Sequence, residues 1–159
     1  MDRALFFLVF AAAIGSAIVG GMFYAFSSFV MKALGRIAPE QGVAAMNSIN
    51  VVVINPSFML AFMGTALVCL ALAFGSYLWW PQTSGKLVLG AALLYLVGTF
   101  GLTMVLHQPM NLKLAALPPA QAIAFWPQYV ATWTTWNHVR TAAPLLATAL
   151  FIAALVLKS

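Results

Sequence analysis

Four long runs of apolar residues dominate the hydropathy pattern, and we expect each to be a membrane-spanning helix. They cover residues 4–30, 53–80, 87–107 and 137–157. A helix needs about 20 apolar residues to cross a bilayer, and backbone groups inside lipid must be paired within their own segment. Strands of an outer-membrane barrel would instead alternate in polarity over about ten residues. The pattern therefore predicts an all-α, integral membrane four-helix bundle that forms a single transmembrane domain, residues 1–159.

The connections between the runs predict two short interfacial helices on the side opposite the termini. The first helix starts at Pro39, because proline suits the first turn of a helix. The second runs from Pro118 to Arg140. Between the second and third runs, the Trp-Trp-Pro sequence at residues 79–81 predicts a short turn with an interfacial aromatic pair. That turn would make the second and third spans antiparallel neighbours.

Composition supports a membrane protein and excludes a soluble one. Hydrophobic residues make up 64% of the chain and charged residues 6%, whereas a soluble domain averages about 45–50% apolar and about 25% charged residues. The net charge of +5 comes from cations that flank the apolar runs, where lysine and arginine reach the headgroups. A nucleic-acid binder would cluster them on one face. We therefore expect the lipid bilayer, and no nucleic acid, as a partner.

Polar side chains that could carry chemistry gather on the membrane side opposite the termini. Only there do the ends of the first and third spans meet the starts of the second and fourth. Amide and ionisable groups near bilayer depth are costly and indicate function, although some can simply pair with free backbone at helix ends. The group comprises Tyr24, Ser27, Ser28, Asn47, Asn50, Asn55, His107, Gln108, Asn111, Trp133, Trp136, Asn137, His138 and Arg140.

An aromatic stripe approaches the fourth span. Trp126, Tyr129, Trp133, Trp136, Asn137 and Arg140 recur at spacings of three and four, which places them on one helix face. Such a wall could hold a flat phenolic or quinone-like molecule, and the guanidinium would favour an enolate or phenolate. The alternative is an interfacial belt, where Trp and Tyr are enriched. We assign Trp126 and Tyr129 to the belt, and Trp136, Asn137 and Arg140 to a site.

The two histidines lie at the same predicted membrane depth. His107 and His138 could act as general bases or as the axial ligands of a haem. Met104, His107 and Met110 could also form a copper(I) site. Because no ligand-type spacing occurs, we expect no cofactor and no metal, with haem or copper as the alternatives. The carboxylates needed for a di-iron site are missing from the spans.

Two motifs resemble those of a known family. The sequences HQPMNLKLA and WTTWNHVRT are similar to hallmarks of the anthrone oxygenase-like family of small four-helix membrane proteins, many of whose bacterial members are known only as a domain of unknown function. The first hallmark is an Asn-x-Pro-Leu-Asn-like motif after the third helix, and the second is a Trp-x-x-Trp-Asn-x-x-Arg-like motif entering the fourth. His107 departs from the pattern, since the family usually has Asn there. The matching positions are Pro109, Met110, Asn111, Trp133, Trp136, Asn137 and Arg140.

The resemblance implies a cofactor-independent oxygenase, an oxidoreductase acting on anthrone-like polycyclic phenols in a bacterial inner membrane. The alternative is a non-enzymatic membrane protein, either a subunit of a larger complex or homo-oligomer, or a binder of a lipophilic ligand, haem or copper. For the oxygenase, the expected catalytic residues are His107, His138 and Arg140. The expected substrate-binding residues are Tyr24, Asn111, Trp133, Trp136 and Asn137.

Overall fold

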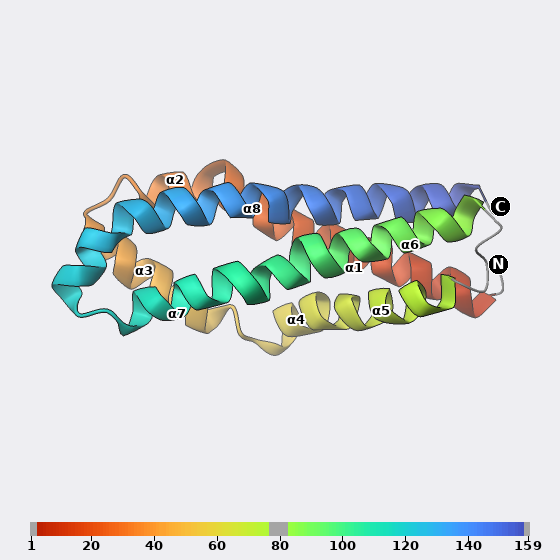
Figure 1. The fold of residues 1–159 in the computed structure, drawn as a ribbon, viewed down its shortest axis with the longest axis horizontal. Helices are drawn as coiled ribbons and strands as arrows, with labels where there is room; N and C mark the ends of the chain where they lie inside the picture. Colours follow the sequence, from red (N-terminus) through yellow and green to blue (C-terminus); the bar gives the residue numbers. More distant parts are fainter. Residues whose placement is uncertain (1–2, 77–82, 158–159) are drawn as a thin grey trace.

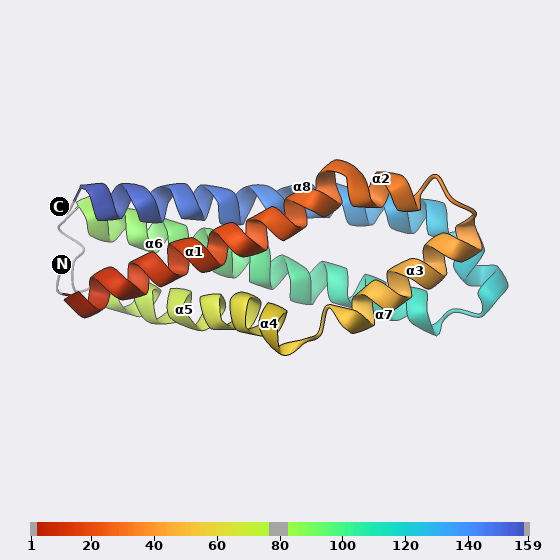
Figure 2. The same ribbon diagram turned by 180° about the vertical axis from the view of Figure 1, so that it is seen from behind.

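The computed structural model, which describes residues 3–76 and 83–157, is an elongated bundle of four helical rods (Figure 1). The rods are Arg3–Leu34, Pro56–Ser76, Thr83–Ala116 and Pro119–Val156, and each is long and apolar enough to cross a membrane. The start of the first rod and the end of the fourth lie at the same end of the bundle (Figures 1 and 2). The described part of the chain contains no strand. The prediction of an all-α membrane bundle is therefore confirmed.

Most rods consist of α-helical and π-helical segments joined end to end, and η denotes a π-helical segment. In chain order the segments are α1 (Arg3–Ala25), η1 (Phe26–Val30), α2 (Met31–Leu34), α3 (Pro39–Val52), α4 (Pro56–Met59), η2 (Leu60–Gly64), α5 (Thr65–Ser76), α6 (Thr83–Tyr95), η4 (Leu96–Gly101), η5 (Thr103–His107), α7 (Gln108–Ala116) and α8 (Pro119–Val156). The helix α3 is the first of the two interfacial helices that the sequence predicted, with proline in its first turn. The turn predicted at residues 79–81 lies outside the described residues.

The second predicted interfacial helix is not separate from the fourth span. The helix α8 runs without a break through 38 residues, although Pro127 and Pro144 lie inside it. At 1.5 Å per residue it is about 57 Å long, whereas the hydrocarbon core of a bilayer is about 30 Å thick. Its first half therefore extends beyond the lipid and packs with η1, α3 and α7 at the end opposite the termini (Figure 2).

Packing explains why the first half of α8 stays helical. Trp126, Tyr129 and Trp133 are buried together with Met46 of α3 and Leu114 of α7. The assignment of Trp126 and Tyr129 to an interfacial belt is thus wrong, because both side chains lie inside the protein. A second hydrophobic cluster fills the other end of the bundle. The molecule therefore has two hydrophobic clusters in series along its length.

The π-helical segments lie in the first three rods, and residues of η1, η2 and η4 pack in or against these two clusters. A π turn leaves part of the regular hydrogen-bond ladder unsatisfied and is often found at functional sites. Side-chain donors reach carbonyl oxygens in or beside these segments. Tyr95 donates to the Phe62 carbonyl at 3.0 Å, and Asn137 donates to the Phe23 carbonyl at 2.8 Å. The midsection of the bundle is therefore held by side chains as well as by the backbone.

We expect Gly98→Ala to destabilise the protein because η4 approaches α8 closely at this position. A Cβ atom on Gly98 would lie 2.5 Å from the Cβ of Ala143, and neither backbone can yield easily. Overpacking of this kind costs about 1–3 kcal/mol. The matched control is Gly64→Ala, also in a π segment, where the nearest atom lies 3.7 Å away on Leu60. Thermal unfolding in detergent measures both variants, and equal unfolding temperatures would contradict this packing.

Candidate functional site

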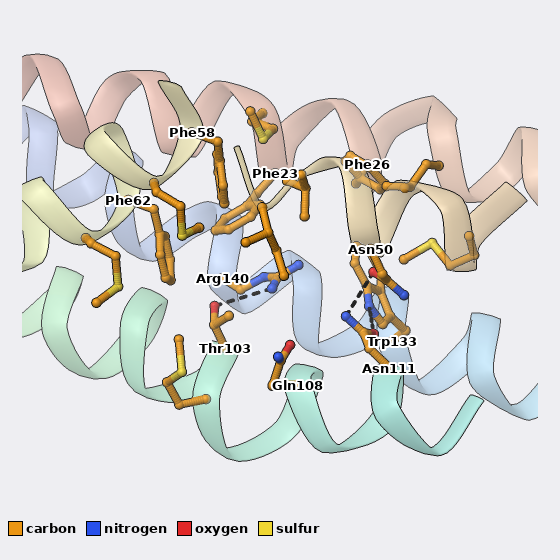
Figure 3. Close-up of a pocket in the computed structure, with 18 residues that line it drawn as sticks. Phe23, Phe26, Asn50, Phe58, Phe62, Thr103, Gln108, Asn111, Trp133 and Arg140 are labelled. Carbon is orange, nitrogen blue, oxygen red and sulfur yellow. Dashed lines mark hydrogen bonds between the residues drawn. The ribbon is translucent and has the colours of Figure 1, made fainter. Parts of the chain in front are cut away.

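A cavity of about 190 Å³ lies between the two hydrophobic clusters (Figure 3). Its walls come from α1 and η1, α3, α4 and η2, η5 and α7, and α8, so that every rod contributes. Most of the lining is aromatic or methionine side chains, and a few polar groups converge on it. That combination is typical of a small-molecule site. The polar lining residues are Asn50, Thr103, Gln108, Asn111 and Arg140.

Arg140 is the charged group of the cavity, and its guanidinium is held in place from several sides. Its Nε and Nη2 atoms donate to Oδ1 of Asn137 at 3.2 and 2.8 Å, and its Nη1 donates to Oγ1 of Thr103 at 3.3 Å. The guanidinium carbon lies 3.9 Å from the ring centre of Phe23 and 5.0 Å from that of Trp133. These contacts fix both the position and the plane of the guanidinium.

The charge of Arg140 is not neutralised by a carboxylate of the described residues. Only 5% of the side chain is exposed. In the described part of the chain, Glu40 is the sole carboxylate side chain, and it is exposed at the start of α3. Burying a cation without an anionic partner costs free energy, and the cation–π contacts offset only part of that cost. The cavity beside Arg140 therefore favours a ligand that carries or develops negative charge.

Asn137 organises the polar group around Arg140. Its Nδ2 atom donates to the Phe23 carbonyl and to Oγ of Ser27, both at 2.8 Å, while its Oδ1 accepts from Arg140. Ser27 in turn lies 2.9 Å from Oγ1 of Thr141. All four hydrogen-bonding positions of the Asn137 amide are thus used. This amide links the first rod to the fourth and orients the guanidinium.

A second polar group lies next to Trp133, away from Arg140 (Figure 3). Oδ1 of Asn111 accepts hydrogen bonds from Tyr129 at 2.8 Å and from the Trp133 indole at 3.2 Å. Nδ2 of Asn111 donates to Oδ1 of Asn50 at 3.0 Å. Because an indole nitrogen can only donate, the Asn111 oxygen must be the atom that faces it. The direction of this chain of hydrogen bonds is therefore determined.

The sequence-predicted site residues occupy three different environments. Asn111, Trp133 and Arg140 line the cavity, and Asn137 is buried behind Arg140. Tyr24, Trp136 and His138 are exposed on the outside of the bundle and do not line the cavity. His107 is fully buried but is also absent from the lining. The structure thus brings together half of the predicted set.

His107 packs behind Trp133. Its Nδ1 lies 3.4 Å from the Leu102 carbonyl and its Nε2 lies 3.3 Å from the Trp133 carbonyl, and the two rings meet edge to face at 5.1 Å. Both ring nitrogens are therefore directed at backbone oxygens. Among the described residues, no group of three or more His, Cys, Asp or Glu side chains is placed to hold a metal ion. The contacts of His107 are suited to positioning Trp133.

Two residues of the site escaped the sequence analysis. Thr103 accepts from Arg140 and donates to the Thr99 carbonyl at 2.7 Å. Its only signal was a threonine inside a mainly apolar span, four residues before His107. Phe23 supplies both a ring and a carbonyl oxygen. Nothing distinguished it from the other phenylalanines of the first span, because its role depends on the fourth rod.

Comparison with protein-family models matches residues 58–150 to the family described as anthrone oxygenase. The matched stretch is more than half of the 159 residues. It begins at Phe58 in the cavity wall and includes Thr103, Asn111, Trp133 and Arg140. No curated protein and no solved structure matches the chain. The match therefore covers both motifs and most of the polar lining of the cavity.

Proposed function

Because the chain belongs to the anthrone oxygenase family, we propose that it is an integral oxygenase of a bacterial inner membrane that oxidises an anthrone-like polycyclic phenol in the cavity. One observation carries this proposal. Arg140 is a buried cation that lacks a carboxylate partner among the described residues, and it lies in the wall of an aromatic-lined cavity. An arginine in that setting favours a flat ligand whose oxygen becomes negative during the reaction.

The chemistry of an anthrone matches this electrostatic feature. Loss of a proton from the ring methylene group gives an enolate whose charge lies partly on the oxygen across the ring. A fixed guanidinium beside that oxygen stabilises the enolate, and such preorganised charge is usually the largest catalytic effect. The electron-rich ring carbon then reacts with dioxygen. Overall the methylene carbon exchanges its two hydrogens for one oxygen atom, and the second oxygen atom leaves as water.

Each part of the cavity has a role in this scheme. The rings of Phe23 and Trp133 hold the flat ring system beside Arg140. The second polar group, Asn111 with Asn50, lies next to the Trp133 indole nitrogen. It is available to form hydrogen bonds with a polar group of the ligand. Among the described residues the lining contains neither a carboxylate nor an imidazole. We therefore propose that water or hydroxide takes the proton, and that His107 serves to position Trp133.

The direct test is oxygenation of anthrone by the purified protein in lipid nanodiscs. We expect anthraquinone to form with one dioxygen consumed per anthrone, and with one ¹⁸O atom in the product when ¹⁸O₂ is supplied. Electrostatic stabilisation by one group is worth about 10²–10³ in rate, so oxidation should exceed that of heat-denatured protein by at least about a hundredfold. Metal analysis and a visible spectrum of the same sample report any copper or haem.

The alternative function is storage or transfer of a lipophilic ligand, which the mainly apolar lining also suits. Tight binding of anthrone without faster oxidation would favour that function and contradict the oxygenase. Neither binding nor oxidation of anthrone would contradict both. These outcomes separate the two proposals in one preparation, because binding is measured without oxygen and turnover with it.

A further inference from the structure

One wall of the cavity is also part of the outer surface of the bundle. Met63 of η2 and Met104 of η5 both line the cavity, yet 39% and 42% of their side chains are exposed. Ile54, between α3 and α4, also lines the cavity and is 63% exposed. Gln108 at the start of α7 is likewise exposed. The opposite walls, formed by Phe23, Trp133 and Arg140, are buried. The cavity therefore opens sideways between the second and third rods.

This opening faces lipid over much of its height. The second rod, Pro56–Ser76, has 21 residues and is therefore about 30 Å long, which matches the hydrocarbon thickness. Pro56 thus lies near the membrane boundary, and Met63 lies about 10 Å inside it. Ile54 and Gln108 are at the boundary end of the opening. A molecule in the bilayer could meet the opening without leaving the membrane.

We propose that this opening is a lateral entrance, through which planar, uncharged molecules dissolved in the bilayer reach Arg140. The inference rests on the proposed function for the nature of the ligand and deepens it by naming the route and the charge state. Methionine side chains are flexible and adapt to apolar surfaces, so Met63 and Met104 can move aside for a flat ring system. A neutral ketone or phenol enters, becomes an enolate only beside Arg140, and leaves as a neutral quinone.

A labelling experiment tests the entrance without relying on turnover. Met46 lines the cavity but is only 1% exposed, so a thiol at that position reacts only with a reagent that has entered the cavity. Met46→Cys is made in a Cys69→Ala background, since Cys69 is the only native cysteine. The protein in vesicles is exposed to pyrene maleimide dissolved in the lipid, or to a sulfonated maleimide in water on both sides.

We expect the lipid-dissolved reagent to label Met46→Cys, and the charged reagent to react at least about tenfold more slowly because it cannot cross hydrocarbon. Adding Met63→Trp and Met104→Trp should fill the opening and slow labelling by pyrene maleimide about tenfold. Each single tryptophan should slow it less. The matched control is Leu67→Trp, on the same rod and also exposed but outside the cavity lining, which should leave the rate unchanged.

Every other result counts against the entrance. Equal labelling by both reagents would mean that water reaches the cavity directly, and no labelling by either would mean that the cavity is closed. An unchanged rate with tryptophan at both methionines, or equal slowing by Leu67→Trp, would also overturn the proposal. Thermal unfolding confirms that each variant is folded. Failure of anthrone oxidation would leave this result intact, because labelling needs no substrate.

Discussion

Replacing Arg140 by lysine should lower kcat/KM for anthrone at least about a hundredfold while the protein still folds. Lysine is also a basic side chain, so this variant tests whether the site needs the planar guanidinium itself. Arginine reaches Asn137 and Thr103 with three different nitrogens, and its guanidinium carbon lies 3.9 Å from the ring centre of Phe23. A lysine ammonium is compact and strongly hydrated, and it can reproduce neither the planar fork nor the stacking. The enolate oxygen would then lose its fixed partner.

The matched control for this prediction is Arg36→Lys. Arg36 is an exposed cation on the same side of the bundle and does not line the cavity, so its replacement should leave kcat/KM unchanged. Turnover and thermal unfolding are measured for both variants in the same lipid. If Arg140→Lys oxidised anthrone at the wild-type rate, Arg140 would be a structural cation that tolerates any positive side chain. The proposed chemistry would then lack its main stabilising group.

Asn137→Ala should reduce both stability and activity. The substitution removes hydrogen bonds to the Phe23 carbonyl, to Ser27 and to two nitrogens of Arg140. Hydrogen bonds within membrane proteins average about 0.6 kcal/mol each, and those to charged groups are stronger. Because the guanidinium is left buried without this acceptor, we expect a loss of about 2–3 kcal/mol in the free energy of unfolding.

The control for Asn137→Ala is Asn47→Ala. Asn47 is a half-buried asparagine of α3 whose Oδ1 has no hydrogen-bond partner, so losing its amide should change stability little. Unfolding in detergent is measured for both variants, and anthrone binding is measured at a temperature where both are folded. Equal stability of the two variants would show that Asn137 does not hold the first and fourth rods together. Normal anthrone affinity in Asn137→Ala would show that the guanidinium needs no support.

The hydropathy pattern by itself determined the fold class, and it predicted that the polar residues at the ends of the runs gather on the side opposite the termini. Lipid leaves the backbone few choices, so uncharged runs of sufficient length must form spanning helices. An even number of spans then places the polar ends of the runs together. The spacing of three and four also identified the stripe to which Trp133, Asn137 and Arg140 belong, because those intervals return to one face of a helix.

Only the tertiary structure decided which members of that stripe face inward. Trp136 is one residue from Asn137, yet it is exposed while Asn137 is buried. Trp126 and Tyr129 became core residues because α3 and α7 cover them beyond the lipid, and an aromatic residue near a membrane boundary has no local feature that distinguishes a belt from a core. Asn137 meets the Phe23 carbonyl across 114 positions of sequence. Such pairing depends on how separate rods pack, so it cannot be predicted from the local sequence pattern of either rod.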